Sequence, residues 1–91
     1  NYRCRRGEID LVMTDDECLV FVEVRYRASR EFGDPLETIT LRKQRRIIAA
    51  ATHFLAANAQ LGDRPCRFDA VGVTGSGDRV EYDWITDAFS T

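Results

Sequence analysis

The segment from Cys18 to Arg27 constrains the fold more than any other part of the chain. It reads Cys-Leu-Val-Phe-Val-Glu-Val-Arg-Tyr-Arg, and its β-branched and aromatic residues are typical of a β-strand. Alternate residues of a strand share a face, so Glu23 lies on the same face as Leu19 and Phe21. Arg25 follows on that face. An unpaired charge among apolar side chains costs several kcal/mol, so Glu23 requires a specific partner.

A second strand precedes this segment in the sequence. Over residues 7–13, apolar side chains recur at every second position, which is the period of a strand. We expect the Asp10 side chain to lie on the opposite face of the strand from Ile9 and Leu11. The polar residues 14–17 are typical of a turn, so the two strands should form an antiparallel hairpin. A register that pairs the strand ends would bring the carboxylates of Asp10 and Glu23 close together.

An amphipathic helix follows the hairpin after a loop that contains glycine and proline. Thr38 or Thr40 can cap this helix, which is expected to run to about Asn58. Its apolar stripe is formed by Ile47, Ile48, Ala51, Phe54 and Leu55. Continued toward the N-terminus, the stripe reaches Lys43 and Gln44. We therefore expect these two polar side chains to point at the face that carries the carboxylates.

The rest of the chain completes one core. Residues 66–74 alternate as a strand, and Asp69 within them is interpreted as a structural hydrogen-bonding residue. Residues 80–89 are compatible with a strand or a short helix, and their aromatic side chains are expected to pack on the core. The order of hairpin, helix and strand predicts a mixed α/β fold, in a single domain over residues 1–91.

The charge distribution matters more than the total charge. A net charge of −2 and a pI near 5.3 give no global electrostatic case for binding nucleic acid. Ten of the thirteen basic residues nevertheless precede position 47, and twelve of the thirteen are arginine, whose planar fork suits phosphate. Arg42, Arg45 and Arg46 crowd the first turns of the helix, where they either contact phosphates or form a solvated face. Arg27 is a further candidate contact.

Other features limit the class of protein. No apolar stretch approaches the length needed to cross a bilayer, so no membrane partner is expected. The three cysteines lack a CxxC pair, which argues against a disulfide framework or a zinc knuckle, and Cys18 and Cys66 are interpreted as small buried residues. The single histidine, His53, has no partner at ligand spacing, which argues against zinc chemistry. We expect a cytoplasmic protein.

Asp10 and Glu23 together predict a divalent-metal site. Two carboxylates in one place repel each other, and a bound Mg²⁺ or Mn²⁺ keeps both ionised. Such an ion favours phosphodiester hydrolysis, because it neutralises charge developing on the phosphate and lowers the pKa of the attacking water. Arg25 is placed to orient both, although a guanidinium is too basic to act as a general base. The alternative is a cross-strand ion pair with Arg25 or Arg27, and Glu8 is either a further ligand or a solvated carboxylate.

Four segments carry a resemblance to a known family: Gly7-Glu8-Ile9-Asp10-Leu11, Leu19-Val20-Phe21-Val22-Glu23-Val24-Arg25, Arg42-Lys43-Gln44 and Cys66-Arg67-Phe68-Asp69-Ala70-Val71. In this order they resemble the YraN-like family of the PD-(D/E)XK nuclease superfamily, over nearly the whole chain. The resemblance implies a restriction-endonuclease-like core, with a mixed β-sheet flanked by helices. It also implies an N-terminal helix that is absent from this sequence, so we expect the chain to be a fragment of a longer protein.

The resemblance assigns roles to individual residues. It implies that Asp10 is the metal-binding aspartate, and that Glu23 and Arg25 occupy the acidic and basic positions of the E-x-K element, where the superfamily carries lysine. Lys43 or Gln44 resembles the polar residue that some branches place on the helix. We therefore expect a metal-dependent nuclease acting on DNA, with branched or damaged structures as candidate substrates.

A second hypothesis belongs to a different class of function. A module that retains the nuclease fold can bind nucleic acid or a protein partner without cleaving, and Arg25 and the acidic pI favour this alternative. The intact pair of Asp10 and Glu23 favours the nuclease. The sequence does not determine the oligomeric state, and a homodimer is compatible with it.

Overall fold

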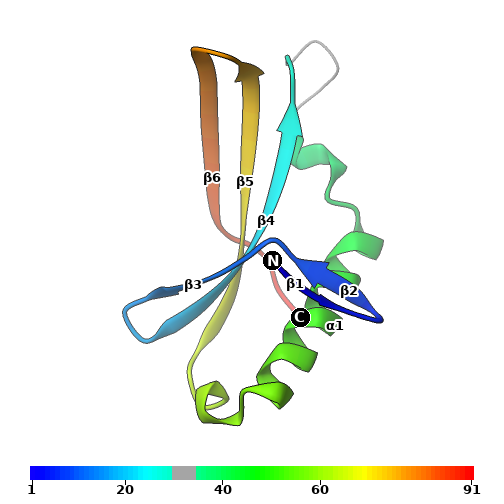
Figure 1. Ribbon diagram of the computed structural model, residues 1–91, viewed down its shortest axis with the longest axis vertical. Helices are drawn as coiled ribbons and strands as arrows, with labels where there is room; N and C mark the ends of the chain where they lie inside the picture. The colour runs from blue at the N-terminus through cyan, green and yellow to red at the C-terminus, as the bar shows by residue number, and fades with distance from the viewer. Residues whose placement is uncertain (30–34) are drawn as a thin grey trace.

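The chain folds as a mixed α/β protein, as its pattern of strands and helix predicts. The structure, a computed structural model, describes residues 1–29 and 35–91. Its elements are β1 (Tyr2–Cys4), β2 (Gly7–Ile9), β3 (Leu11–Asp15), β4 (Cys18–Arg27), the short 3-10 helix η2 (Pro35–Thr38), α1 (Leu41–Ala57), the 3-10 helix η3 (Ala59–Leu61), β5 (Cys66–Ser76) and β6 (Arg79–Phe89). Figure 1 shows α1 on one side of the strands, with the β1–β2 pair beside it.

The main sheet has the strand order β3-β4-β5-β6. Strands β3 and β4 form the expected antiparallel hairpin, with Asp15 opposite Cys18. Strand β5 runs parallel to β4, and β6 returns antiparallel to β5. Parallel neighbours need a long crossover connection, which α1 supplies here. This mixed sheet with its crossover helix is compatible with a restriction-endonuclease-like core.

Residues 7–13 do not form the single strand that their alternation predicts. β2 pairs with β1, whereas β3 pairs with β4, and the chain bends at Asp10 between them. Ile9 is buried under α1, but Leu11 is 46% exposed. The expectation that both neighbours of Asp10 share one face was therefore wrong. A period of two reports which residues alternate, but it does not show where a strand changes its partner.

The core between the sheet and α1 contains Ile9, Leu19, Phe21, Ile47, Ala50, Ala51 and Phe68. Phe21 stacks on Phe68 with ring centroids 5.5 Å apart, and Phe68 stacks on Phe89 at 5.1 Å. Val20, Val22 and Val71 form a second buried group, on the face of the sheet opposite α1. Glu23 lies on the α1 face as well, because residues two positions apart in a strand share a face and Leu19 and Phe21 are on this side.

The helix begins where its cap predicts. The Thr40 hydroxyl accepts a hydrogen bond from the Lys43 amide at 3.2 Å, so Thr40 and not Thr38 is the N-cap. At the other end, the Asn58 side-chain amide donates to the Phe54 carbonyl at 2.9 Å. In the described part of the chain, no helix combines the length and the apolar character that crossing a bilayer requires.

Residues 80–89, whose sequence is compatible with a strand or a short helix, belong to strand β6. Its aromatic residues do not all pack on the core as expected. Phe89 does, but Trp84 is 47% exposed and Tyr82 is 70% exposed. Both belong to the face of the sheet that α1 does not cover. The interpretation of Cys66 as a buried residue was also wrong, because its side chain is exposed.

Candidate metal centre

A cavity of about 260 Å³ lies where β4, the bend between β2 and β3, and the first turns of α1 meet. We call it the carboxylate pocket. It is lined by Glu8, Asp10, Glu23, Val24, Arg25, Lys43, Arg46 and Ile47. The two carboxylates that the sequence singles out therefore share one cavity with a lysine and two arginines. The expectation that Asp10 and Glu23 come close together is confirmed, while their chemical roles remain predictions.

Asp10 is held in place by the backbone of the neighbouring strand. The amide of Val24 donates a hydrogen bond to Asp10 Oδ2 at 2.8 Å. Because Asp10 sits at the bend between β2 and β3, its carboxylate can reach across to β4. Val24 directly follows Glu23 in the chain, so this hydrogen bond holds Asp10 beside the part of β4 that carries Glu23.

Glu23 is electrostatically the most perturbed carboxylate of the pocket. Its side chain is 12% exposed. Burial, a hydrogen bond with Asp10 and the negative charge of Asp10 raise the pKa of Glu23 from its ordinary 4.5 to about 8. The positive charges of Arg25 and Lys43 oppose this rise. In the absence of a cation, Glu23 therefore carries a proton at neutral pH.

Arg25 is anchored to the end of η2, the short 3-10 helix that precedes α1. Its Nε donates to Thr38 Oγ1 at 2.7 Å, and its Nη1 lies 3.9 Å from Glu23 Oε2. A separation this long makes the ion pair weak. The contact between Glu23 and Arg25 thus lies within β4 and is not the cross-strand ion pair of the alternative interpretation, whereas the carboxylate of Asp10 accepts its 2.8 Å bond from a backbone amide.

Lys43 and Gln44 line different cavities, although both continue the apolar stripe of α1. Lys43 lines the carboxylate pocket, and its charge acts on Glu23. The Gln44 side chain instead donates to the Ile39 carbonyl at 3.3 Å and lines a neighbouring cavity beside Ala70. The expectation that Gln44 points at Asp10 and Glu23 was wrong. Consecutive helical residues differ in direction by about 100°, which directs the side chains of Lys43 and Gln44 to different cavities.

The candidate phosphate-binding arginines are also divided. Arg46 lines the carboxylate pocket, whereas Arg42 and Arg45 are exposed on α1 outside its lining. Arg27 is partly buried near the end of β4, away from the lining residues. The structure thus brings one of these four arginines to the two carboxylates.

Glu8 borders the pocket, but its carboxylate interacts with residues of the N-terminal segment. Arg3 Nε lies 2.9 Å from Glu8 Oε2, and the Asn1 side-chain amide donates to the same oxygen at 3.3 Å. This contact fits the interpretation of Glu8 as a solvated carboxylate. Within residues 1–29 and 35–91, no three or more histidine, cysteine, aspartate or glutamate side chains are grouped to hold a metal ion. Of the three carboxylates that line the pocket, Asp10 and Glu23 are the pair joined by a hydrogen bond.

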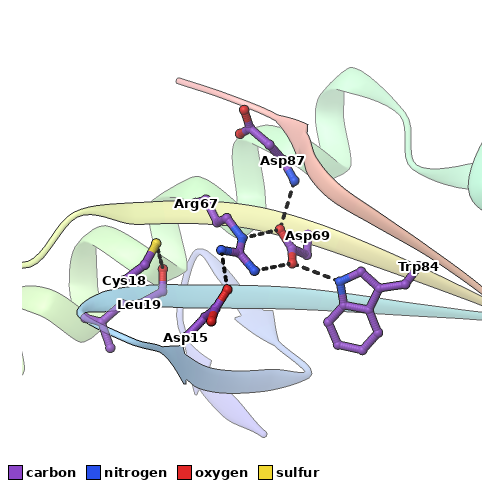
Figure 2. A network of polar contacts seen from close by, with 7 residues as sticks. All are labelled: Asp15, Cys18, Leu19, Arg67, Asp69, Trp84 and Asp87. Atoms are coloured by element: carbon purple, nitrogen blue, oxygen red, sulfur yellow. Dashed lines mark hydrogen bonds and ion pairs between the residues drawn. The ribbon is translucent and has the colours of Figure 1, made fainter.

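Asp69 belongs to a different polar network, on the sheet face opposite α1 (Figure 2). Its carboxylate is fully buried and accepts bonds from the Arg67 guanidinium at 3.0 and 3.2 Å, from Trp84 Nε1 at 2.9 Å and from the Asp87 amide at 2.9 Å. Burial alone would raise the pKa of Asp69, but these bonds outweigh it and hold the pKa below its ordinary value. The interpretation of Asp69 as a structural hydrogen-bonding residue is confirmed.

Fold and pocket together define a small α/β protein in which two carboxylates meet beside a mixed β-sheet. Its sequence matches the profile of the uncharacterised protein family UPF0102 over residues 1–73, and the chain belongs to this family. It is 52% identical to a UPF0102 protein of Nitrosococcus oceani over 89 residues, which cover 98% of this chain and 72% of that protein.

Two further relatives support the assignment. A UPF0102 protein of Nitrosospira multiformis is 54% identical over 90 residues, which cover 98% of this chain and 72% of the relative. A UPF0102 protein of Stutzerimonas stutzeri is 46% identical over 91 residues, which cover the whole of this chain and 76% of the relative. The aligned region includes β6, which the family profile does not reach.

Proposed function

We propose that the chain is a metal-dependent nuclease domain that hydrolyses phosphodiester bonds in DNA, as members of the PD-(D/E)XK superfamily do. The observation that carries this proposal is the meeting of Asp10 and Glu23 in one pocket with Lys43 on its wall. The resemblance of the sequence to the YraN-like family supports the same reaction class. Branched or damaged DNA is the proposed substrate, and the cytoplasm is the proposed location.

The donor set of the pocket fits Mg²⁺ or Mn²⁺. Burial and Asp10 raise the pKa of Glu23 despite the nearby charges of Arg25 and Lys43, so a divalent cation would favour the ionised form of Glu23. Mg²⁺ commonly binds one or two carboxylates and completes its coordination with water and substrate phosphate. Asp10 and Glu23 would hold such an ion. When bound, it would stabilise negative charge on the phosphate and make a coordinated water more acidic.

The remaining groups of the pocket would position the substrate. Lys43 reaches the pocket from α1 and supplies a compact positive charge that can bind a phosphate oxygen. The Val24 amide keeps the Asp10 carboxylate oriented. Arg25, held by Thr38, would orient Glu23 instead of activating water, because its guanidinium stays protonated. Lys43 thus takes the cationic role that lysine of the E-x-K element has elsewhere.

A non-catalytic binding module is the second candidate, and the contacts of Arg25 favour it. Its guanidinium already bonds to Thr38 Oγ1 and faces Glu23, so the basic position of the E-x-K element is occupied by a structural interaction. A protein of this kind would bind nucleic acid with the same surface but would not require a cation for binding.

A titration with Mn²⁺ separates the two candidates. We expect wild-type protein to bind Mn²⁺ calorimetrically and to cleave forked, looped or linear DNA, and Asp10→Ala to lose both properties. Glu17→Ala is the matched control, because Glu17 is an exposed carboxylate in the turn between β3 and β4. DNA binding without cation-dependent cleavage would favour the binding module. Equal cleavage by wild type and Asp10→Ala would contradict the metal centre.

A second comparison tests the role of the helix. Lys43→Ala should reduce cleavage far more than Arg45→Ala, because Lys43 lines the pocket whereas Arg45 is exposed on α1 outside the lining. An exposed arginine contributes only a screened contact to phosphate. Losses of equal size, both abolished by moderate salt, would mean that the helix supplies a diffuse positive field.

A further inference from the structure

The β1–β2 hairpin projects two arginines at its tip. Cys4 pairs with Gly7, so the turn consists of Arg5 and Arg6 alone. Both side chains are exposed. Strand β2 leads within one residue to Asp10, so this turn is connected to the carboxylate pocket by a very short and regular piece of chain.

The hairpin is docked tightly on α1. A Cβ atom at Gly7 would lie only 2.5 Å from the carbonyl oxygen of Arg46, so a glycine is required for this approach. Arg46 Nε donates to the Arg6 carbonyl at 3.4 Å. At the base of the hairpin, the Tyr2 ring packs edge-on against Phe54 with centroids 5.2 Å apart. These contacts fix the position of the hairpin arginines relative to the pocket.

A second cavity, of about 350 Å³, lies between the hairpin and the helix. We call it the hairpin cavity. Its lining residues are Arg3, Cys4, Gly7, Glu8 and Arg46. Glu8 and Arg46 also line the carboxylate pocket, so the two cavities adjoin along these side chains.

Positive charge is concentrated on the β1–β2 hairpin and the facing turn of α1. Arg3 is balanced by Glu8 at 2.9 Å, which leaves Arg46 on the cavity wall and Arg5 and Arg6 at the exposed turn, outside the cavity lining, as the local excess. The chain as a whole has a net charge of −2, so this excess stands against the overall balance. Arginine forks match phosphate geometry well, and clustered exposed arginines attract polyanions.

We propose that Arg5 and Arg6 of the hairpin turn, together with Arg46 of α1, form a phosphate subsite for a DNA strand that extends beyond the carboxylate pocket. This inference rests on the proposed nuclease function and specifies its substrate class. The ligand is a strand of several nucleotides whose phosphates extend from the carboxylate pocket past Arg46 to the hairpin turn. A mononucleotide or a single phosphodiester would reach only the carboxylate pocket.

The test measures binding without cleavage. In EDTA, fluorescence anisotropy follows the binding of a single-stranded DNA oligonucleotide and of a dinucleotide, as a function of salt. The variant Arg5→Ala/Arg6→Ala is compared with Arg64→Ala/Arg79→Ala, which removes the same charge from exposed arginines outside both cavities. Arg5→Gln/Arg6→Gln repeats the first change with longer side chains, and thermal melting verifies that each variant is folded.

We expect the hairpin variants to bind the oligonucleotide about tenfold more weakly and to lower the salt slope by about 1.4, the value for two contacts to a single strand. The control variant should resemble wild type, and the dinucleotide should not distinguish the proteins. Equal losses in hairpin and control variants, an equal loss with the dinucleotide, or no oligonucleotide binding by wild type would overturn the subsite. The nuclease proposal is judged separately, by Mn²⁺-dependent cleavage and its loss in Asp10→Ala.

Discussion

The stability of the metal-free protein should depend on pH through Glu23. Its pKa is about 8 in the folded protein and 4.5 when unperturbed. Between these values, the folded state holds a proton that the unfolded state has released. Raising the pH therefore favours unfolding, and a difference of one proton corresponds to about 1.4 kcal/mol per pH unit. The loss begins near pH 5 and ends near pH 8, where Glu23 is ionised in both states.

Glu23→Gln removes this titration and keeps the size and the polar character of the side chain. In EDTA, the unfolding free energy of wild type should fall relative to that of the variant as the pH rises through this window. Urea denaturation at several pH values measures both, with the emission of Trp84, the single tryptophan, as the signal. Glu17→Gln, at an exposed turn position, should run parallel to wild type.

The outcome separates a repulsive pair from a structural ion pair. Parallel curves of unfolding free energy against pH for wild type and Glu23→Gln would refute the raised pKa. A variant that is less stable than wild type at pH 8 would show that Glu23 mainly acts as the ion-pair partner of Arg25. Addition of Mg²⁺ at pH 8 should stabilise wild type and leave Glu23→Gln unchanged, because the cation binds the folded state only where both carboxylates are present.

Substitutions at three further positions test the framework of the fold by urea denaturation. Gly7→Ala should lower the unfolding free energy by about 1–3 kcal/mol, because the new Cβ would lie 2.5 Å from the Arg46 carbonyl oxygen, and an unchanged midpoint would contradict this close approach. Asp69→Ala should cost about 3–5 kcal/mol, because it removes the buried partner of the Arg67 guanidinium and the acceptor of the Trp84 indole; a loss below about 1 kcal/mol would mean that solvent replaces the carboxylate. Thr40→Ala should cost about 1 kcal/mol and Thr40→Ser much less, and equal losses would argue against the cap.

The sequence was sufficient to find Glu23 and Lys43, because each places a charge where the periodic pattern requires an apolar side chain. Glu23 interrupts a strand, and Lys43 continues a helical stripe. A charge of this kind is costly unless a partner is present, so the pattern itself indicates a site. The fold class followed from the same periodicities. The chemical roles of these residues still depend on the experiments above.

Other features depend on contacts that no local pattern records. Gln44 continues the stripe as well as Lys43 does, and only the surroundings of the helix decide which of the two faces the pocket. The bend at Asp10 arises because β2 and β3 pair with different strands. The close approach that requires Gly7 involves a backbone atom 39 positions later in the chain, at Arg46. The sequence also does not record which cation Glu8 pairs with, and in the structure it is Arg3.

Strand β6 has a consequence for self-association. It borders the described sheet, and its exposed Val80, Tyr82 and Trp84 would make an unprotected edge prone to pair with another molecule. Glu81 and Asp83 alternate with these apolar residues along the strand. Two molecules that joined their β6 strands edge to edge would bring these carboxylates together, and the repulsion opposes aggregation. Glu81 and Asp83 therefore act as gatekeeper residues of this edge.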